Sequence, residues 1–304
     1  MLRFIARRIL ETIPVLIIIA TGTFFLIHAK PGGPFDREKA TTPEIRKAIQ
    51  AAYGLDQPLH VQYLTYMKQL LKGDLVSFKY ANRTVKELIL SAFPASLELG
   101  CLSLAIALTL GMTAGLIAAL HKNSIFDYSA MSLTMIGICL PTFVLGPLLA
   151  LAFAIHLKWF NAIGWDFARD RALPALTLSL YFTAYIARLT RSGLLEILNQ
   201  DFIRTARAKG ASTTRILFRH ALRGGLAPVV SYLGPATAGV ITGSFVAETV
   251  FQIPGLGRFF VTSVFNSDYF LVCGTVIFYG TLIIFFNLLA DIAQVWLNPK
   301  LKFE

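Results

Sequence analysis

The chain has 304 residues, of which 55% are hydrophobic and only 15% charged, and its mean hydropathy is +0.63. Soluble domains carry about a quarter charged residues, so this chain lacks the polar groups that cover a water-facing surface. The composition predicts an integral membrane protein and excludes a disordered chain, a disulfide scaffold and a soluble enzyme. A net charge of +11 would suggest nucleic-acid binding in a soluble protein, but in a membrane protein it reports orientation and contact with anionic lipid.

Six stretches free of Asp, Glu, Lys and Arg are long and apolar enough to cross a bilayer core of about 30 Å. Each must be helical, because lipid offers no partner for a free backbone amide. A closed barrel is excluded, since barrel strands alternate apolar with polar residues. We therefore predict an all-α membrane protein with six transmembrane helices. The charge-free stretches are residues 12–29, 99–120, 128–157, 172–187, 224–247 and 269–290.

Basic residues in short loops set the orientation of membrane helices. The N-terminal arginines, Lys122, the loop between the fourth and fifth stretches, and Lys300 and Lys302 fall on one side if there are six spans. We therefore expect both termini to be cytoplasmic and the first stretch to be a retained anchor.

Residues 31–93 are expected to form a small helical segment outside the cytoplasm, with no site of its own. Three helices are predicted there. The first begins at Thr42-Pro43-Glu44 and ends at Gly54. The second runs from Pro58 to Lys72, has Leu64, Met67 and Leu71 on one face, and stops at Gly73. A capping box from Thr84 to Glu87 opens the third.

The cytoplasmic loop, residues 192–225, is too polar to span a membrane but has helical periodicity. Leu194, Leu198 and Phe202 recur every four residues and continue to Ala206, which predicts one apolar helix face ending at Gly210.

A second helix is predicted to begin at the N-cap Ser212-Thr213-Thr214. Two stripes are expected on it, one of arginines and one of apolar residues. They are Arg215, Arg219 and Arg223, and Phe218, Ala221 and Leu222. The pattern indicates either a docking helix-turn-helix or an interfacial helix on anionic lipid.

The sequence Thr205-Ala206-Arg207-Ala208-Lys209-Gly210, followed by Leu222, resembles the EAA loop of binding-protein-dependent ABC importer permeases. That motif runs Glu-Ala-Ala, three residues, Gly, nine residues, Ile-x-Leu-Pro. Ala206, Gly210 and Leu222 match the motif's second alanine, glycine and leucine.

The departures from the motif are those of the peptide and nickel branch of the family. Arg204 and Thr205 replace the first Glu and Ala, His220 stands at the Ile position, and Arg223 replaces the proline. These differences weaken the likeness to sugar and phosphate permeases.

The likeness covers nearly the whole chain. Residues 8–16 with Pro31-Gly-Gly-Pro-Phe35 look like the N-terminal signature of that branch, and residues 246–257 look like its C-terminal signature. Residues 73–80 are similar to the oligopeptide permease B subunits in particular.

This resemblance implies a type I ABC importer permease fold in a bacterial inner membrane. A permease of this kind forms half of a translocation path with a homologous second permease subunit. Two ABC ATPase subunits lie beneath it, and a periplasmic binding protein delivers the peptide. The implied divisions are residues 1–30 (tail and first helix), 31–93 (extracytoplasmic), 94–295 (permease core) and 296–304 (tail). Within the core, spans are expected at about 97–120, 130–157, 172–191, 226–248 and 269–293.

The helix around Gly210 would then be the coupling helix, seated in a cleft of one ATPase. The implied ATPase-coupling residues are Thr205, Ala206, Arg207, Ala208, Lys209, Gly210 and Leu222. Small residues there would let backbones approach closely, and Arg207 and Lys209 would add charge pairs.

We expect no enzymatic chemistry, cofactor, metal site or nucleic-acid partner. The sequence contains no phosphate-binding Gly-rich loop, and its five histidines never lie at ligand spacing. Glu248 is a weak candidate for the substrate path, and structural pairing, for example with Arg258, is the alternative.

Two kinds of alternative remain open at this point. Within the family, the cargo could be a dipeptide, glutathione or nickel, since these importers share the motifs. Outside it, the chain could be a standalone channel or an ion-coupled carrier, in which case the docking-type loop would have no purpose.

Overall fold

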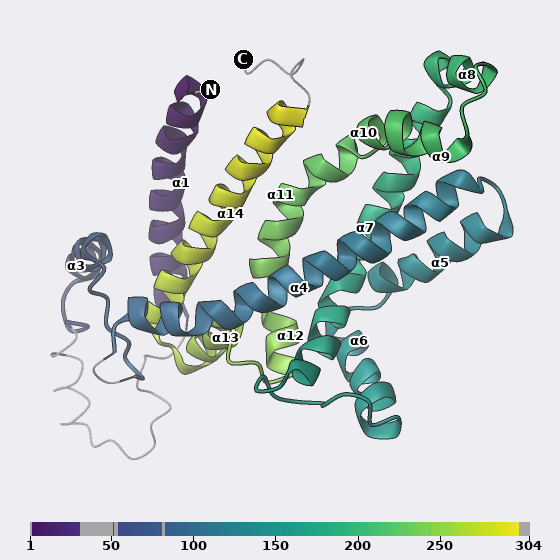
Figure 1. Cartoon of the computed structure of the whole chain (residues 1–304). Coiled ribbons are helices and arrows are strands. Elements are labelled where there is room, and N and C mark those ends of the chain that lie inside the picture. The colour runs from purple at the N-terminus through teal and green to yellow at the C-terminus, as the bar shows by residue number, and fades with distance from the viewer. Residues whose placement is uncertain (1, 31–50, 52–53, 81–82, 243, 298–304) are drawn as a thin grey trace. The chain divides into compact units, whose positions relative to one another are not determined.

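The computed structural model describes residues 2–30, 51, 54–80, 83–242 and 244–297. Its described elements are helical, apart from one isolated bridge between Val76 and Thr84. In chain order they begin with α1 (Leu2–His28), α3 (Leu59–Lys72), α4 (Val85–Leu120), α5 (Ile125–Cys139), α6 (Thr142–Leu149), the π-helical turn η1 (Ala150–His156) and α7 (Ala168–Leu198). They continue with α8 (Asp201–Ala208), α9 (Thr213–Ile216), the π-helical turn η2 (Leu217–Ala221), α10 (Leu222–Gly225), α11 (Ala227–Thr242), α12 (Phe245–Val250), α13 (Leu256–Asn266) and α14 (Tyr269–Leu297) (Figure 1).

The all-α membrane fold is confirmed. Among the residues that the structure describes, five helical segments are long and apolar enough to cross a membrane, namely Leu10–His28, Val85–Leu120, Ala168–Leu198, Ala227–Val250 and Tyr269–Ile292. A sixth span is available if the bent pair α5 and α6–η1 is counted as one crossing.

The third predicted span is not one straight helix. The stretch 128–157 is broken between α5 and α6, and the helix direction bends by 109° at the break. The break falls at Leu140, which is extended (φ −102°, ψ 121°), before Pro141. Proline disfavours the helical conformation of the residue before it and has no N–H for the helix ladder, so Pro141 ends one helix and begins the next.

The chain divides into two units. The first contains Ser96–Ile253 and the residues from Ile283 onward, and the second contains Leu2–Ala95 and Pro254–Leu282. Both α4 and α14 contribute residues to each unit.

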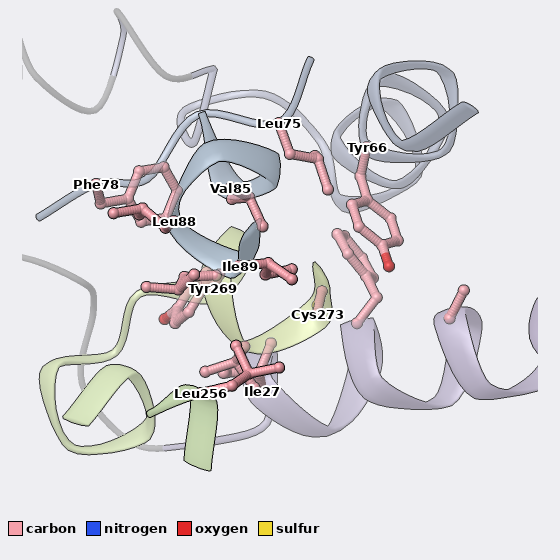
Figure 2. Close-up of a cluster of buried hydrophobic side chains, with 14 of the residues drawn as sticks. Ile27, Tyr66, Leu75, Phe78, Val85, Leu88, Ile89, Leu256, Tyr269 and Cys273 are labelled. Carbon is pink, nitrogen blue, oxygen red and sulfur yellow. The ribbon is translucent and has the colours of Figure 1, made fainter. Parts of the chain in front are cut away.

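The second unit has its own hydrophobic core, which joins α1, α3, the start of α4 and the first turns of α14 (Figure 2). Tyr66 of α3 is fully buried and stacks on Phe24 of α1, with ring centroids 5.3 Å apart. The predicted helix after Pro58 is confirmed as α3, which ends at Gly73 in the left-handed conformation (φ 75°). Of the three residues predicted on one face, Met67 packs against the core, whereas Leu64 and Leu71 are 65% and 85% exposed.

The face of α3 that packs is the one that carries aromatic residues. Tyr63, Tyr66, Met67 and Leu70 lie in or against the core. Regular spacing identified a helix but not its orientation, because aromatic rings in α1 and α14 favour the tyrosine-bearing side.

The capping box at Thr84 and Glu87 is confirmed by two reciprocal hydrogen bonds between each side chain and the other backbone N–H, at 3.2 and 3.1 Å. The helix that it opens is α4, which continues without a break past Pro94 to Leu120. The predicted first helix, from Thr42 to Gly54, lies outside the described residues apart from its end.

Asp268, a residue that sequence patterns did not single out, fastens residues 73–80 to the start of α14. Its carboxylate is 1% exposed and accepts hydrogen bonds from the Ser77 hydroxyl and from the backbone N–H groups of Phe78 and Lys79. Asp268 also accepts from Leu271 N–H in the first turn of α14, so one buried carboxylate organises two segments.

Candidate functional site

The loop between α7 and α11 consists of short helices, but its first half departs from the predicted geometry. The expected continuous helix is interrupted at Asn199 and Gln200, and Gln200 is extended (φ −74°, ψ 152°). Because α8 starts afresh there, its buried residue is Ile203 (0% exposed), whereas Phe202 is 50% exposed. The apolar face predicted from Leu194 to Ala206 is therefore divided between two helices, with Leu194 buried and Phe202 exposed.

Gly210 stops α8 as predicted. Its φ is +80°, and two backbone hydrogen bonds close the end of the helix, from Ala211 N–H to Ala206 O (3.1 Å) and from Gly210 N–H to Arg207 O (2.9 Å). This pair of bonds is a Schellman motif, which satisfies the last carbonyls of a helix. A Cβ on Gly210 would meet nothing within 4 Å, so within this chain the glycine is needed for its conformation and not for space.

The second half of the loop begins at the predicted cap. The Ser212 hydroxyl accepts a hydrogen bond from Arg215 N–H, and the three arginines of the predicted stripe are all exposed. Of the predicted apolar stripe, Ala221 is buried and Leu222 half-buried, whereas Phe218 is 68% exposed. Residues 217–221 form the π-helical turn η2, and the other buried positions of this segment are Ile216 and Leu217.

Buried contacts attach this loop to the spans of the first unit. Leu217 and Ala221 of η2 pack with Ala119 of α4 and Leu194 of α7. At the same junction Gly193 of α7 lies so close to α10 that a Cβ on it would be 2.2 Å from Gly225 O. The loop is therefore packed against the helix ends and does not hang freely from them.

An ion pair reinforces this end of the unit. Arg191 of α7 donates from Nε to Asp127 Oδ1 (2.7 Å) and from Nη2 to Asp127 Oδ2 (2.8 Å). Asp127 lies in the first turn of α5, is 2% exposed, and also accepts a hydrogen bond from Asn123 N–H (2.9 Å). The turn between α4 and α5 is thus tied to the part of α7 that leads into the loop.

The residues singled out from the sequence form a largely exposed surface. Thr205, Arg207, Ala208, Lys209 and Gly210 are exposed, and Ala206 and Leu222 are half-buried. In Figure 1, α8 and α9 lie beyond the end of α7, at the opposite end from α6. This surface carries several cations and few acids, so its electrostatics favour an acidic partner or anionic lipid.

We name Thr205–Gly210, together with the exposed rings of Phe202 and Phe218, the loop surface. The sequence placed the two rings on apolar helix faces, and their exposure in the structure makes them functional candidates. Their exposure accompanies the break at Gln200 and the π-helical turn η2, and sequence periodicity reveals neither of these irregularities.

Glu248, the weak path candidate, is fully buried in α12. Its Oε1 accepts hydrogen bonds from Ser96 (2.7 Å) and Ser244 (2.5 Å). These hydrogen bonds hold the carboxylate within the fold, and its contribution to a translocation path stays a prediction. In the part of the chain that the structure describes, no group of three His, Cys, Asp or Glu side chains could hold a metal ion.

The fold and the loop match a known class of membrane permeases. Residues 111–303 match the family "Binding-protein-dependent transport system inner membrane component", and residues 1–100 match its N-terminal counterpart. The chain belongs to this family, so it is a multi-pass inner-membrane transport subunit and not an enzyme.

Relatives in this family are similar over their whole length. The chain is 47% identical to the oligopeptide transport system permease protein OppB of Haemophilus influenzae, covering 100% of both chains. It is 41% identical to the dipeptide transport system permease protein DppB of Bacillus subtilis, covering 99% of this chain and 98% of that one. The MetNI methionine ABC transporter in an inward-facing conformation shares the fold, with a TM-score of 0.57 at 16% identity over 70% of this chain and 97% of that one.

Proposed function

We propose that this chain is a permease subunit of an ATP-driven importer and forms half of the path for oligopeptides. A periplasmic binding protein delivers the peptide, a homologous second permease subunit completes the path, and two ABC ATPase subunits supply the energy. The proposal rests on one observation above all: the Schellman-ended turn at Gly210 is exposed, while the next part of the same loop packs against the ends of the spans through Leu217 and Ala221. The oligopeptide cargo is supported by the full-length similarity to OppB.

The coupling residues in this proposal are Thr205, Ala206, Arg207, Ala208, Lys209, Gly210 and Leu222. The small and exposed side of α8 would enter a cleft of one ATPase, where Arg207 and Lys209 meet acidic side chains. Closure of the ATPase pair would then displace the loop, and the packing of Leu217 and Ala221 on Leu194 would carry that displacement to α7.

In this arrangement the loop faces the cytoplasm, and so do both termini. The basic residues of the loop support this orientation, since positive charge in short loops is retained on the cytoplasmic side.

The test is uptake by the assembled complex in proteoliposomes, with labelled pentapeptide, dipeptide, glutathione and nickel compared side by side. We expect saturable, ATP-dependent uptake of the pentapeptide that requires the binding protein. Nickel uptake without peptide uptake would reject the oligopeptide assignment and favour the nickel alternative.

Purification in mild detergent separates the importer from a standalone channel or carrier. We expect the ATPases and the second permease to co-purify with this chain. Gradient-driven flux through the isolated chain, without ATPases, would instead support the channel or carrier.

A further inference from the structure

The middle of α7 is buried on almost every side. Residues 172–187 are all described by the structure, and within them only Tyr181 is exposed, at 42%. Tyr185, one helical turn further on, is half-buried and lies on the same face. Within this part of α7 the one exposed side chain is therefore a tyrosine, and Leu176 and Leu180 are half-buried.

A third tyrosine extends this surface onto α11. Tyr181 and Tyr185 have ring centroids 5.1 Å apart. Tyr185 in turn stacks on Tyr232 of α11 at 5.7 Å and 26°. The three rings form a continuous surface, the tyrosine surface, which bridges two membrane-spanning helices.

Other exposed faces of the same unit have a different chemistry. The exposed large side chains of α5, α6 and η1 are mostly aliphatic and suit contact with lipid tails, and the exposed Tyr128 (62%) lies in the first turn of α5, away from mid-span. They include Ile125, Phe126, Leu133, Ile136, Phe143, Leu148, Leu151 and Ile155, each at least 45% exposed.

The position of these tyrosines along the membrane-spanning helix gives the contrast with the aliphatic faces a functional meaning. Tyr181 and Tyr185 flank the midpoint of α7, whereas tyrosines that contact lipid concentrate at the membrane–water interfaces. Polar groups within spans face the bundle interior or a water-filled cavity. An exposed phenol at mid-span therefore indicates water on that side of the helix.

We infer that Tyr181, Tyr185 and Tyr232 line the translocation path and contact the peptide within it; this inference rests on the proposed function. Every peptide presents amide donors and acceptors together with varied side chains. A phenol donates and accepts hydrogen bonds, and its ring offers apolar contact at low conformational cost. A surface of such groups binds peptide backbone without selecting one sequence.

Cysteine accessibility in the assembled complex tests this assignment. In a Cys101→Ser, Cys139→Ser background, which removes the two exposed thiols, Tyr181→Cys is compared with Leu133→Cys. Leu133 is 67% exposed on α5 and serves as the matched lipid-facing control. Both are treated with the charged, water-soluble reagent 2-sulfonatoethyl methanethiosulfonate, and modification is followed as the mass increase of this chain by intact-protein mass spectrometry.

We expect the thiol at 181 to react at least roughly tenfold faster than that at 133, because the reactive thiolate forms where water reaches the sulfur. Excess binding protein loaded with pentapeptide, under turnover with ATP, should slow the reaction at 181 and leave 133 unchanged. In the unaltered cysteine background, Tyr185→Phe should reduce peptide uptake less than Tyr185→Ala, since the ring remains.

Three results would overturn the inference. Equal, slow labelling at both positions would place the tyrosine surface in lipid. Crosslinking of the thiol at 181 to the second permease without labelling would make it a subunit contact. Labelling that loaded binding protein does not alter would remove the peptide contact. Failure of the proposed function gives a different result from failure of this inference. In that case the wild-type complex does not import pentapeptide, whatever the labelling rate of the thiol at 181.

Discussion

Arg191 of α7 holds the carboxylate of Asp127 in α5 through two parallel hydrogen bonds of 2.7 and 2.8 Å. The two residues are far apart in the sequence, and the pair links the turn after α4 to the helix that carries the coupling loop. Bidentate pairs of this kind fix geometry as well as contribute energy.

Arg191→Gln should destabilise the folded subunit by about 3 kcal/mol, since it leaves the Asp127 carboxylate buried without its cation. This is near the lower limit for a buried pair because the Arg191 side chain is 29% exposed. The measurement is the thermal unfolding midpoint of the purified complex. The double variant Asp127→Asn, Arg191→Gln should be more stable than Arg191→Gln, because no isolated charge remains. Arg204→Gln, which breaks an exposed pair with Asp201, is the control and should leave the midpoint unchanged.

Gly210→Asp should abolish ATP-dependent uptake while insertion into the membrane stays normal. No atom lies within 4 Å of the added Cβ, and Asp tolerates the left-handed conformation better than most residues, so the chain itself should accept the change. Gly210→Asn is the matched control, of the same size without the charge, and should keep more uptake if the partner cleft is acidic. Normal transport by the Asp variant would count heavily against the coupling role.

Phe202→Ala and Phe218→Ala should each weaken retention of the ATPases by roughly tenfold, because exposed aromatic side chains are frequent energetic centres of interfaces. Neither change should alter the stability of the isolated subunit, since the rings are 50% and 68% exposed. Retention is measured by co-purification at increasing dilution. Leu133→Ala on α5 is the control, and equal loss of ATPases in that variant would sink the interface assignment.

Gly193→Ala should destabilise the junction between α7 and α10 by about 1–3 kcal/mol, the usual cost of overpacking, because the new Cβ would be 2.2 Å from Gly225 O. Gly22→Ala in α1 is the matched helix control, as a Cβ there meets nothing within 4 Å. It should be neutral or stabilising, since alanine favours helix more than glycine does. The measurement is the unfolding midpoint of each variant in detergent. Equal midpoints for the two variants would argue against close contact at Gly193.

Much of the fold could be predicted because membrane insertion imposes strong local constraints. Charge-free stretches of sufficient length identified the spans, and the stop at Gly210, the cap at Ser212 and the capping box at Thr84 each depend on neighbouring residues only. The helix faces were harder to predict. Leu64 and Leu71 of α3, and Phe202 and Phe218 of the loop, were predicted on apolar helix faces and are exposed in the structure.

The exposed rings of the loop follow from local irregularities. A break at Gln200 starts α8 afresh, and a π-helical turn includes Phe218, and periodicity counted along an unbroken helix cannot register either. The orientation of α3 depends instead on the aromatic rings of α1 and α14 that Tyr63 and Tyr66 contact. Proline at position 141 favours a break or a kink, and the structure shows a break that separates the stretch into two helices.

The amino-acid sequence by itself determined the class of this protein, because hydrophobic length, loop charge and the EAA-like segment are properties of contiguous residues. Only the tertiary structure decided which side chains are available for function. Contacts between residues distant in the chain pair Asp127 with Arg191 and enclose Glu248. They also leave the side chain of Tyr181 exposed. Such contacts depend on how helices pack against one another, and no local pattern specifies that packing.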